Sequence, residues 1–188
     1  MYKDLEEQDL AKFCSRRDRL AEKELYNRYA ARLYTLCRRY IGNTEDAEDV
    51  FQESLIKVLD RITSFKYSGK GSLYAWIRRI AVNNALNHIR NDRKRPVFLE
   101  EVFDEEIEDI PDLSGNEVQG VPNEKLLEMI ACLSDMRRTV FNLYCLEKYS
   151  HQEIGKMLGI SEKGSAGFLA KARKQLREEI KRYLNDSE

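Results

Sequence analysis

The sequence predicts an all-α protein with two helical domains joined by an acidic linker, the C-terminal one a helix-turn-helix. Three observations lead to this prediction. Apolar residues recur at helical spacing through most of the 188 residues. Only three prolines and nine glycines interrupt that pattern. One stretch has nine carboxylates and no cation, and it divides the chain into 1–95, 96–122 and 123–188.

The first domain is predicted to open with three amphipathic helices, at residues 5–14, 20–41 and 46–59. Gly42 is expected to end the second of them, because glycine is the commonest residue just after a helix. Asn43 or Thr44 can cap the third, since the side-chain oxygen of either can accept a bond from a first-turn amide.

Carboxylates and one amide gather on the third helix, largely off its apolar face: Asp46, Asp49, Gln52 and Glu53. The domain around them is basic, with 20 cations against 14 carboxylates over residues 1–95. An acidic surface repels DNA, so we expect it to face a basic protein partner. Metal binding is the enzyme alternative, but no histidine or second acidic cluster joins these residues.

A loop over residues 64–72, with two glycines, two lysines and two aromatic residues, leads into a fourth predicted helix over residues 73–90. Ser72 is the expected N-cap. One face of the helix is mainly apolar and comprises Leu73, Ile77, Ile80, Ala81 and Asn84. Another face carries the polar stripe Arg79, Asn83, Asn87 and Arg90, with Trp76 at its edge. Such groups contact phosphates, base edges and base faces. The alternative is a solvated face on an ordinary helix.

The linker interleaves its carboxylates with apolar residues, and Gly115, Gly120 and Pro122 break any regular element. Two interpretations stay open. It is either a disordered tether or a nucleic-acid mimic that lies in a basic channel.

The last 66 residues predict a compact helical module. Ser134 is expected to cap one helix, and Ser150 and Glu153 form a capping box at the next. A tight turn at 159–161 follows, and Ser161 caps the last helix. Two helices around such a turn indicate a helix-turn-helix. On the last helix, Leu169, Ala172 and Leu176 are predicted inward, and Lys163, Gly167, Ala170 and Lys174 outward, flanked by Lys171.

The remaining features argue against other classes of protein. No apolar run is long enough to span a membrane, and the charged N-terminus lacks a signal-peptide core, so we expect a cytoplasmic protein. Cys14, Cys37, Cys132 and Cys145 show no zinc spacing and are expected to be buried thiols. We predict no metal site, no cofactor and no enzymatic activity.

Three segments together resemble the bacterial sigma-70 family, extracytoplasmic-function (ECF) group. Residues 44–53 resemble its core-polymerase-binding helix, residues 76–83 its −10 promoter helix, and residues 149–161 with 171–174 its −35-binding helix-turn-helix. The resemblance implies an initiation factor that binds core RNA polymerase and promoter DNA and opens DNA strands without nucleotide hydrolysis. It also implies an anti-sigma factor as a further binding partner.

The resemblance also assigns roles to residues. The polymerase-binding residues would be Asp46, Asp49, Gln52 and Glu53. The −10 DNA-binding residues would be Phe65, Lys66, Lys70, Ser72, Trp76, Arg79, Asn83, Asn87 and Arg90, with the loop near residues 65–72 trapping an unstacked base. The −35 DNA-binding residues would be Ser161, Lys163, Gly167, Lys171, Arg173 and Lys174.

The recognition helix departs from the family pattern. Ser165 stands where the family often has valine, and residues 166–168 are Ala, Gly and Phe where basic or polar residues often face DNA. We therefore expect an unusual −35 readout, with backbone approach in place of side chains.

Three other functions compete with this interpretation. A helix-turn-helix regulator would bind DNA without core polymerase, but it would not need the acidic helix. A nucleic-acid enzyme would need carboxylates or a histidine in mutual reach. A structural adaptor would leave the polar stripe unexplained.

Overall fold

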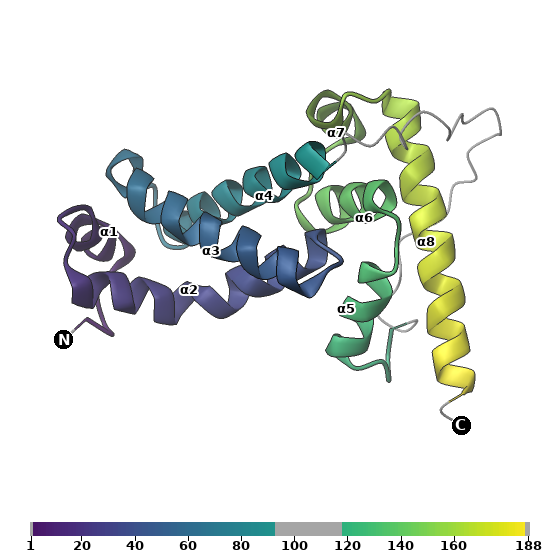
Figure 1. Cartoon of the computed structure of the whole chain (residues 1–188), viewed down its shortest axis with the longest axis horizontal. Helices are drawn as coiled ribbons and strands as arrows, with labels where there is room; N and C mark the ends of the chain where they lie inside the picture. Colours follow the sequence, from purple (N-terminus) through teal and green to yellow (C-terminus); the bar gives the residue numbers. More distant parts are fainter. Residues whose placement is uncertain (1, 93–117, 187–188) are drawn as a thin grey trace. The chain divides into compact units, whose positions relative to one another are not determined.

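The computed structural model describes residues 2–92 and 118–186, and within these ranges all regular elements are helical (Figure 1). The all-α prediction is thus confirmed. The chain divides into two compact units, residues 1–92 and 93–188, and each is described by itself. The acidic residues from Glu100 to Glu117 lie outside the described residues, so the role of the linker stays a prediction.

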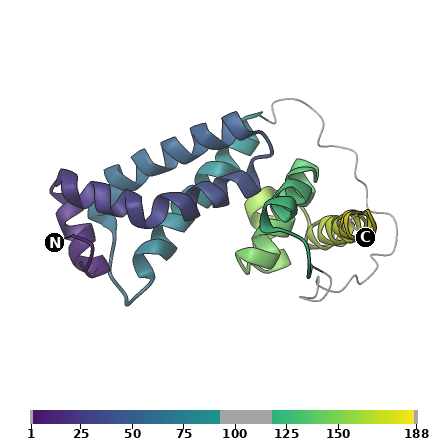
Figure 2. The same ribbon diagram turned by 90° about the horizontal axis from the view of Figure 1, so that it is seen from below.

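The first unit contains four α-helices and a 3-10 turn among its described residues: α1 (Glu7–Ser15), α2 (Arg19–Tyr40), α3 (Thr44–Arg61), η1 (Ile62–Ser64) and α4 (Ser72–Asp92). The long helices α2, α3 and α4 pack against one another, and α1 packs across α2 (Figures 1 and 2). Their shared core is apolar because each helix turns one stripe inward. Its fully buried side chains include Leu33, Leu36, Val50, Leu73 and Ile77.

Two helix boundaries differ from the prediction. The second helix ends at Tyr40, where Ile41 leaves the helix with an extended backbone and a buried side chain. Gly42 does not adopt a left-handed conformation and does not end the helix, so that prediction is wrong. The third helix begins at Thr44, and Asn43 caps it, because its Oδ1 accepts the backbone N–H of Glu45 at 2.8 Å.

The second unit contains α5 (Asn123–Ala131), α6 (Asp135–Phe141), the π-helical η2 (Asn142–Leu146), α7 (His151–Leu158) and α8 (Glu162–Asn185). Helix α8 packs against α5, α6 and α7. Val121, within the predicted linker, is already buried in this unit. Ser134 occupies the N-cap position of α6 as predicted, but its side chain makes no cap hydrogen bond.

The cysteines divide into two pairs. Cys14 and Cys37 are buried as predicted, and burial raises their pKa values to about 11 and about 12, so both stay protonated thiols. Cys132 is exposed and Cys145 is half-buried, which corrects the prediction for this pair. Cys132 lies at the C-terminal end of α5, where the chain turns toward α6, and has left the packed face.

Candidate functional site

Helix α3 presents an acidic surface, formed by Asp46, Asp49, Gln52 and Glu53. Asp49, Gln52 and Glu53 are exposed, and Asp46 is half-buried. The opposite face holds Ala47, Val50, Ser54 and Val58, which are buried. The sequence prediction of an outward acidic face on this helix is therefore confirmed in its geometry.

A lysine on α3 lowers the pKa of one carboxylate of the acidic surface. Lys57 Nζ lies 2.7 Å from Glu53 Oε1, one helical turn away. This hydrogen bond lowers the pKa of Glu53, so the carboxylate stays charged at neutral pH. Ile56 lies beside these residues on α3 and is 60% exposed. The charge pattern did not single out Ile56, which adds an apolar side chain next to Gln52 on the same surface.

A buried asparagine ties α3 to α4. Asn84 Nδ2 donates to the carbonyl of Val50 at 3.2 Å and to Ser54 Oγ at 3.1 Å, and its Oδ1 accepts from Lys57. Asn84 is only 3% exposed, so these bonds form away from water. The sequence placed Asn84 on the apolar face of α4, which is correct. Its partners across the helix interface could not be read from spacing.

The polar stripe of α4 faces solvent. All four of its members, Arg79, Asn83, Asn87 and Arg90, are exposed. The apolar face of the same helix is buried and includes Leu73, Ile77, Ala81 and Asn84. A row of guanidinium and amide groups at one-turn spacing can hold phosphates and bond to base edges.

Two aromatic residues lie beside the stripe. The ring of Phe65, which follows η1, lies 5.7 Å from the indole of Trp76, tilted at 58°. Both side chains are half-buried, so each keeps part of its ring in contact with solvent. Lys66 and Lys70 are exposed in the loop between them. Flat rings and cations together are the groups that bind unstacked nucleotides.

The start of α4 differs from the prediction. Ser72 is the first residue of the helix, and its Oγ accepts the backbone N–H of Ser68 at 3.3 Å. The amides at this end are bonded by a carboxylate from α1. Glu7 Oε2 accepts from the N–H groups of Gly71 and Leu73, both at 3.0 Å. No local pattern indicates this cap, because Glu7 lies more than sixty residues from both amides in the chain.

In the second unit, α7 and α8 form the predicted helix-turn-helix. The capping box at Ser150 and Glu153 is present with both of its bonds. Gly159 ends α7 in the left-handed conformation at φ 72°, which an L side chain rarely adopts. Ser161 Oγ then caps α8 by accepting from Gly164 N at 2.9 Å. Three local sequence signals thus account for the motif.

Close backbone approach also shapes the turn. A Cβ at Gly155 would lie 2.8 Å from the carbonyl oxygen of Ile160, closer than any normal contact. Gly155 therefore lets α7 approach the chain that leads into α8. Helical spacing does not indicate this requirement, because Gly155 lies inside the α7 pattern and not in a turn.

Fewer of the predicted −35 residues face outward from the second unit than expected. Gly167 is buried, so the prediction that it faces outward is wrong. The Arg173 guanidinium lies 5.6 Å from the centre of the Tyr144 ring, within the unit, instead of pointing wholly outward. Lys163 and Lys174 are exposed and Lys171 is half-buried. The Ser161 hydroxyl is exposed but engaged as the cap of α8.

Ser165 has a structural partner. Its hydroxyl lies 2.9 Å from Nδ1 of His151, at the start of α7, and the His151 ring stacks on Tyr144 with 4.4 Å between centroids. Burial and the nearby Arg173 lower the pKa of His151, which favours the neutral ring. The unusual serine in the recognition helix thus bonds to the preceding helix, where a valine would only pack.

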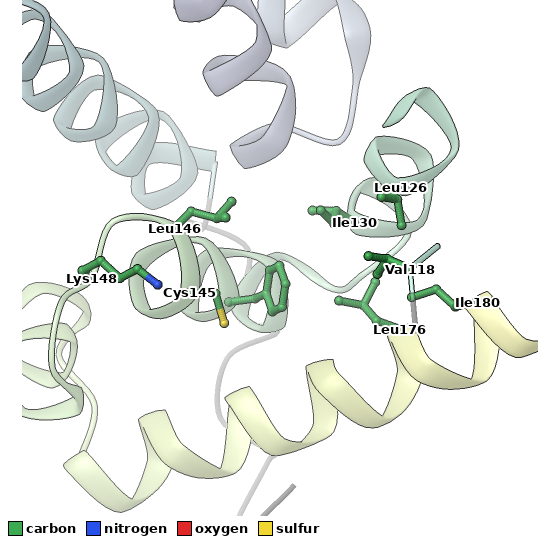
Figure 3. A pocket seen from close by; sticks show the side chains of 9 residues that line it. Val118, Leu126, Ile130, Cys145, Leu146, Lys148, Leu176 and Ile180 are labelled. Carbon is green, nitrogen blue, oxygen red and sulfur yellow. The ribbon is translucent and has the colours of Figure 1, made fainter. Parts of the chain in front are cut away.

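An apolar cavity of about 340 Å³ opens in the second unit. Figure 3 shows Leu126 and Ile130 of α5 across from Leu176 and Ile180 of α8, which all line it. Lys148 and Cys145 bring the only ionisable side chains to its lining among the described residues.

Across residues 2–92 and 118–186, no cluster of His, Cys, Asp or Glu is placed to hold a metal ion. Within those ranges, none of the helices combines the length and the hydrophobicity that a membrane span requires.

Parts of both units match models of known protein regions. Residues 25–95 match the model of Sigma-70 region 2, and residues 123–176 match that of Sigma-70, region 4. The ECF RNA polymerase sigma-E factor of Haemophilus influenzae is 30% identical over 167 residues, which cover 84% of this chain and 86% of that protein. The ECF RNA polymerase sigma factor SigW of Bacillus subtilis is 29% identical over 174 residues, 87% and 91% of the two chains.

A longer relative and a solved structure complete the comparison. The chain is 27% identical to the ECF RNA polymerase sigma factor SigE of Mycolicibacterium smegmatis, of which it spans 63%. The sigma factor RpoE of Bartonella quintana, solved with the anti-sigma factor NepR, shares the fold with a TM-score of 0.50 and 19% identity, over 85% of this chain and 96% of that one. Two matched regions in the family's order, with a relative of 30% identity over most of both chains, place this chain in the ECF group of the sigma-70 family of RNA polymerase sigma factors, which are transcription initiation factors and not enzymes.

Proposed function

We propose that this chain binds core RNA polymerase through the acidic surface of α3, recognises the −10 element through α4 and the loop before it, and contacts the −35 element through α7 and α8. The observation that carries the proposal is the pairing of two opposite chemistries in one unit. An exposed acidic surface and an exposed stripe of arginines and asparagines lie on two helices that pack together. A protein that must hold both a polymerase and DNA needs both surfaces.

The acidic surface suits a basic protein partner. Asp49, Gln52 and Glu53 offer charge and hydrogen bonding, and Ile56 adds an apolar contact at their side. Charged rims of this kind steer association and fix orientation, while an apolar side chain contributes burial.

At the −10 element, the amides and the arginines of α4 would contact different parts of the DNA. Asn83 and Asn87 can bond to base edges, and Arg79 and Arg90 can hold phosphates. Phe65 and Trp76, with Lys66 and Lys70 nearby, would receive a base that has left the stack. Unstacking one base costs a few kcal/mol, and these contacts supply it without nucleotide hydrolysis.

At the −35 element, backbone groups and lysines would take the place of the basic or polar side chains that often face DNA in this family. Lys163, Lys171 and Lys174 would contact phosphates from α8, and the small side chain of Ala166 lets the helix approach the groove. Ser161 would hold the start of α8 in place through its cap and would contact DNA through its backbone. Gly167 and Arg173 take no part in this proposal, because the first is buried and the second lies against Tyr144.

Regulation and location follow from the same proposal. The chain would act in the cytoplasm, where RNA polymerase transcribes. An anti-sigma factor would hold it inactive, as NepR accompanies RpoE in the related structure. Residues 96–122 would connect the two DNA-binding domains, 1–95 and 123–188, and reach toward the polymerase active centre.

Run-off transcription tests the proposal. Core polymerase, genomic DNA and the purified chain together should give discrete transcripts that neither core nor chain gives alone. The alternative is a helix-turn-helix regulator that acts without core polymerase. Specific promoter binding by the chain alone, with no change in transcription when core is added, would favour that alternative.

A further inference from the structure

Helix α1 lies outside the part of the chain that matches the region 2 model, which begins at residue 25. It nevertheless contacts the elements on both sides of the loop at residues 65–71. It packs against η1, where the loop begins, and against α4, where the loop ends. The segment is therefore placed to hold the loop in one position.

The contact at the far end of the loop is a carboxylate clasp. One oxygen of Glu7, Oε2, accepts from the amides of both Gly71 and Leu73 at 3.0 Å. The other, Oε1, accepts from the hydroxyl of Tyr29 in α2 at 3.3 Å. Burial and Glu7 itself raise the pKa of Tyr29 to about 12, so the hydroxyl keeps its proton and donates. One side chain thus joins three helices.

The loop needs such an anchor. Gly69 and Gly71 both have positive φ, at 120° and 89°, and a Cβ on either would meet open space, so neither is held by packing. Glycine loses more conformational freedom on ordering than any other residue. A loop that binds an unstacked base must either be ordered beforehand or lose affinity when it is ordered on binding.

We propose that Glu7 is a positioning residue for the −10 site: it fixes the end of the base-binding loop and the first turn of α4, so that Phe65, Trp76 and the polar stripe are arranged before DNA arrives. The inference rests on the proposed function of that loop. It adds a role for α1 and Glu7 that touches no DNA, and it depends on the reach and acceptor oxygens of the side chain, not on its charge.

Matched variants distinguish the effect of the length of the Glu7 side chain from the effect of its charge. Glu7→Gln keeps the length and one carbonyl acceptor but removes the charge. Glu7→Asp keeps the charge but is one methylene too short to reach Gly71 and Leu73. Asp9→Ala removes a carboxylate from the same first turn of α1, where Asp9 is exposed, and serves as the control.

Amide hydrogen exchange on the full chain tests the clasp by itself. Exchange at Gly71 and Leu73 should rise roughly tenfold in Glu7→Asp and stay within about threefold of the unaltered chain in Glu7→Gln and Asp9→Ala. Unchanged exchange in Glu7→Asp would overturn the clasp. Faster exchange throughout the first unit would show general destabilisation and would overturn the positioning role as well.

Permanganate reactivity of unpaired −10 thymines in the holoenzyme tests the role. Glu7→Asp should open the promoter roughly tenfold less, with core affinity within about twofold, while Glu7→Gln and Asp9→Ala open it normally. Normal opening by Glu7→Asp, or loss in Glu7→Gln alone, would overturn the inference and leave the proposed function standing. Normal opening by Phe65→Ala with Trp76→Ala, at unchanged core affinity, would overturn the proposed function of the loop and the inference with it.

Discussion

Asn83 and Asn84 are neighbours in sequence with opposite environments. Asn83 is exposed on the polar stripe, and Asn84 is buried and bonded to α3. One residue of helical rotation separates a group free to read DNA from a group that joins two helices. The pair therefore provides a direct test of how the two roles divide.

We expect Asn83→Ala to leave unfolding unchanged and to lose about 1–3 kcal/mol at one −10 base, relaxing the preference there. Asn84→Ala should instead destabilise the first unit by about 1–3 kcal/mol, because Ser54 and Lys57 lose a buried partner. Thermal unfolding and selection over randomised −10 positions measure the two effects. A uniform loss of activity in Asn83→Ala, with no shift in base preference, would make Asn83 a structural residue.

His151 gives the second unit a predictable pH dependence. Its pKa lies below the usual value of about 6.5, so the folded state binds the proton less tightly than the unfolded chain. The stability that the neutral ring contributes is fully present above about pH 6.5. It is lost as the pH falls toward and through the lower pKa of the folded state. Arg173 opposes protonation, and Glu162 favours it to a smaller extent.

Thermal unfolding from about pH 7.5 to about pH 5.5 checks this sign. The unaltered chain should lose stability over that range, and His151→Gln, which stays neutral, should lose less. The control is Ser165→Ala, which removes the hydroxyl partner but leaves the titrating ring. Equal pH slopes in the unaltered chain and His151→Gln would show that other groups account for the dependence.

At the scale of elements, local signals predicted what the chain builds from neighbouring residues. The capping box at Ser150, the left-handed turn at Gly159 and the cap at Ser161 follow from side chains within four residues of each other. The outward acidic surface and the polar stripe follow from helical periodicity. These parts of the fold and the site could be predicted from sequence alone.

Contacts between distant residues could not be predicted in this way. Spacing cannot indicate that Glu7 caps α4 or that Asn84 joins Val50 and Ser54, because these bonds depend on how helices pack. Gly167 was misplaced for a related reason. It shares the face of α8 that packs inward, and a residue without a side chain contributes nothing to an apolar pattern.

The acidic surface of α3 supports a prediction at the same scale. Asp49→Lys, or Gln52→Ala with Glu53→Lys, should weaken core polymerase binding by a few kcal/mol, since charge reversal opposes a basic partner. Folding should be preserved, because these side chains are exposed. The control is Asp9→Lys, the same charge reversal at an exposed position of α1. Unchanged affinity in a core pull-down would contradict the assignment of α3.

At the scale of the whole molecule, a net charge of −1 conceals an uneven distribution. Residues 96–122 carry nine carboxylates and no cation, whereas the segments on either side both have an excess of cations. Overall charge would have argued against a nucleic-acid binder. The distribution along the chain, and then the separation of acidic and basic groups onto different helices, is what points to an initiation factor.

The most direct test of this account is strand opening at one promoter with purified core polymerase, followed by permanganate reactivity at the −10 element. The unaltered chain should open the promoter only with core. Gln52→Ala with Glu53→Lys should lose opening together with core binding, and Arg79→Ala with Asn83→Ala should lose opening while core binding stays normal. Opening by the chain without core, or equal loss of core binding in both variants, would contradict two separate surfaces for polymerase and DNA.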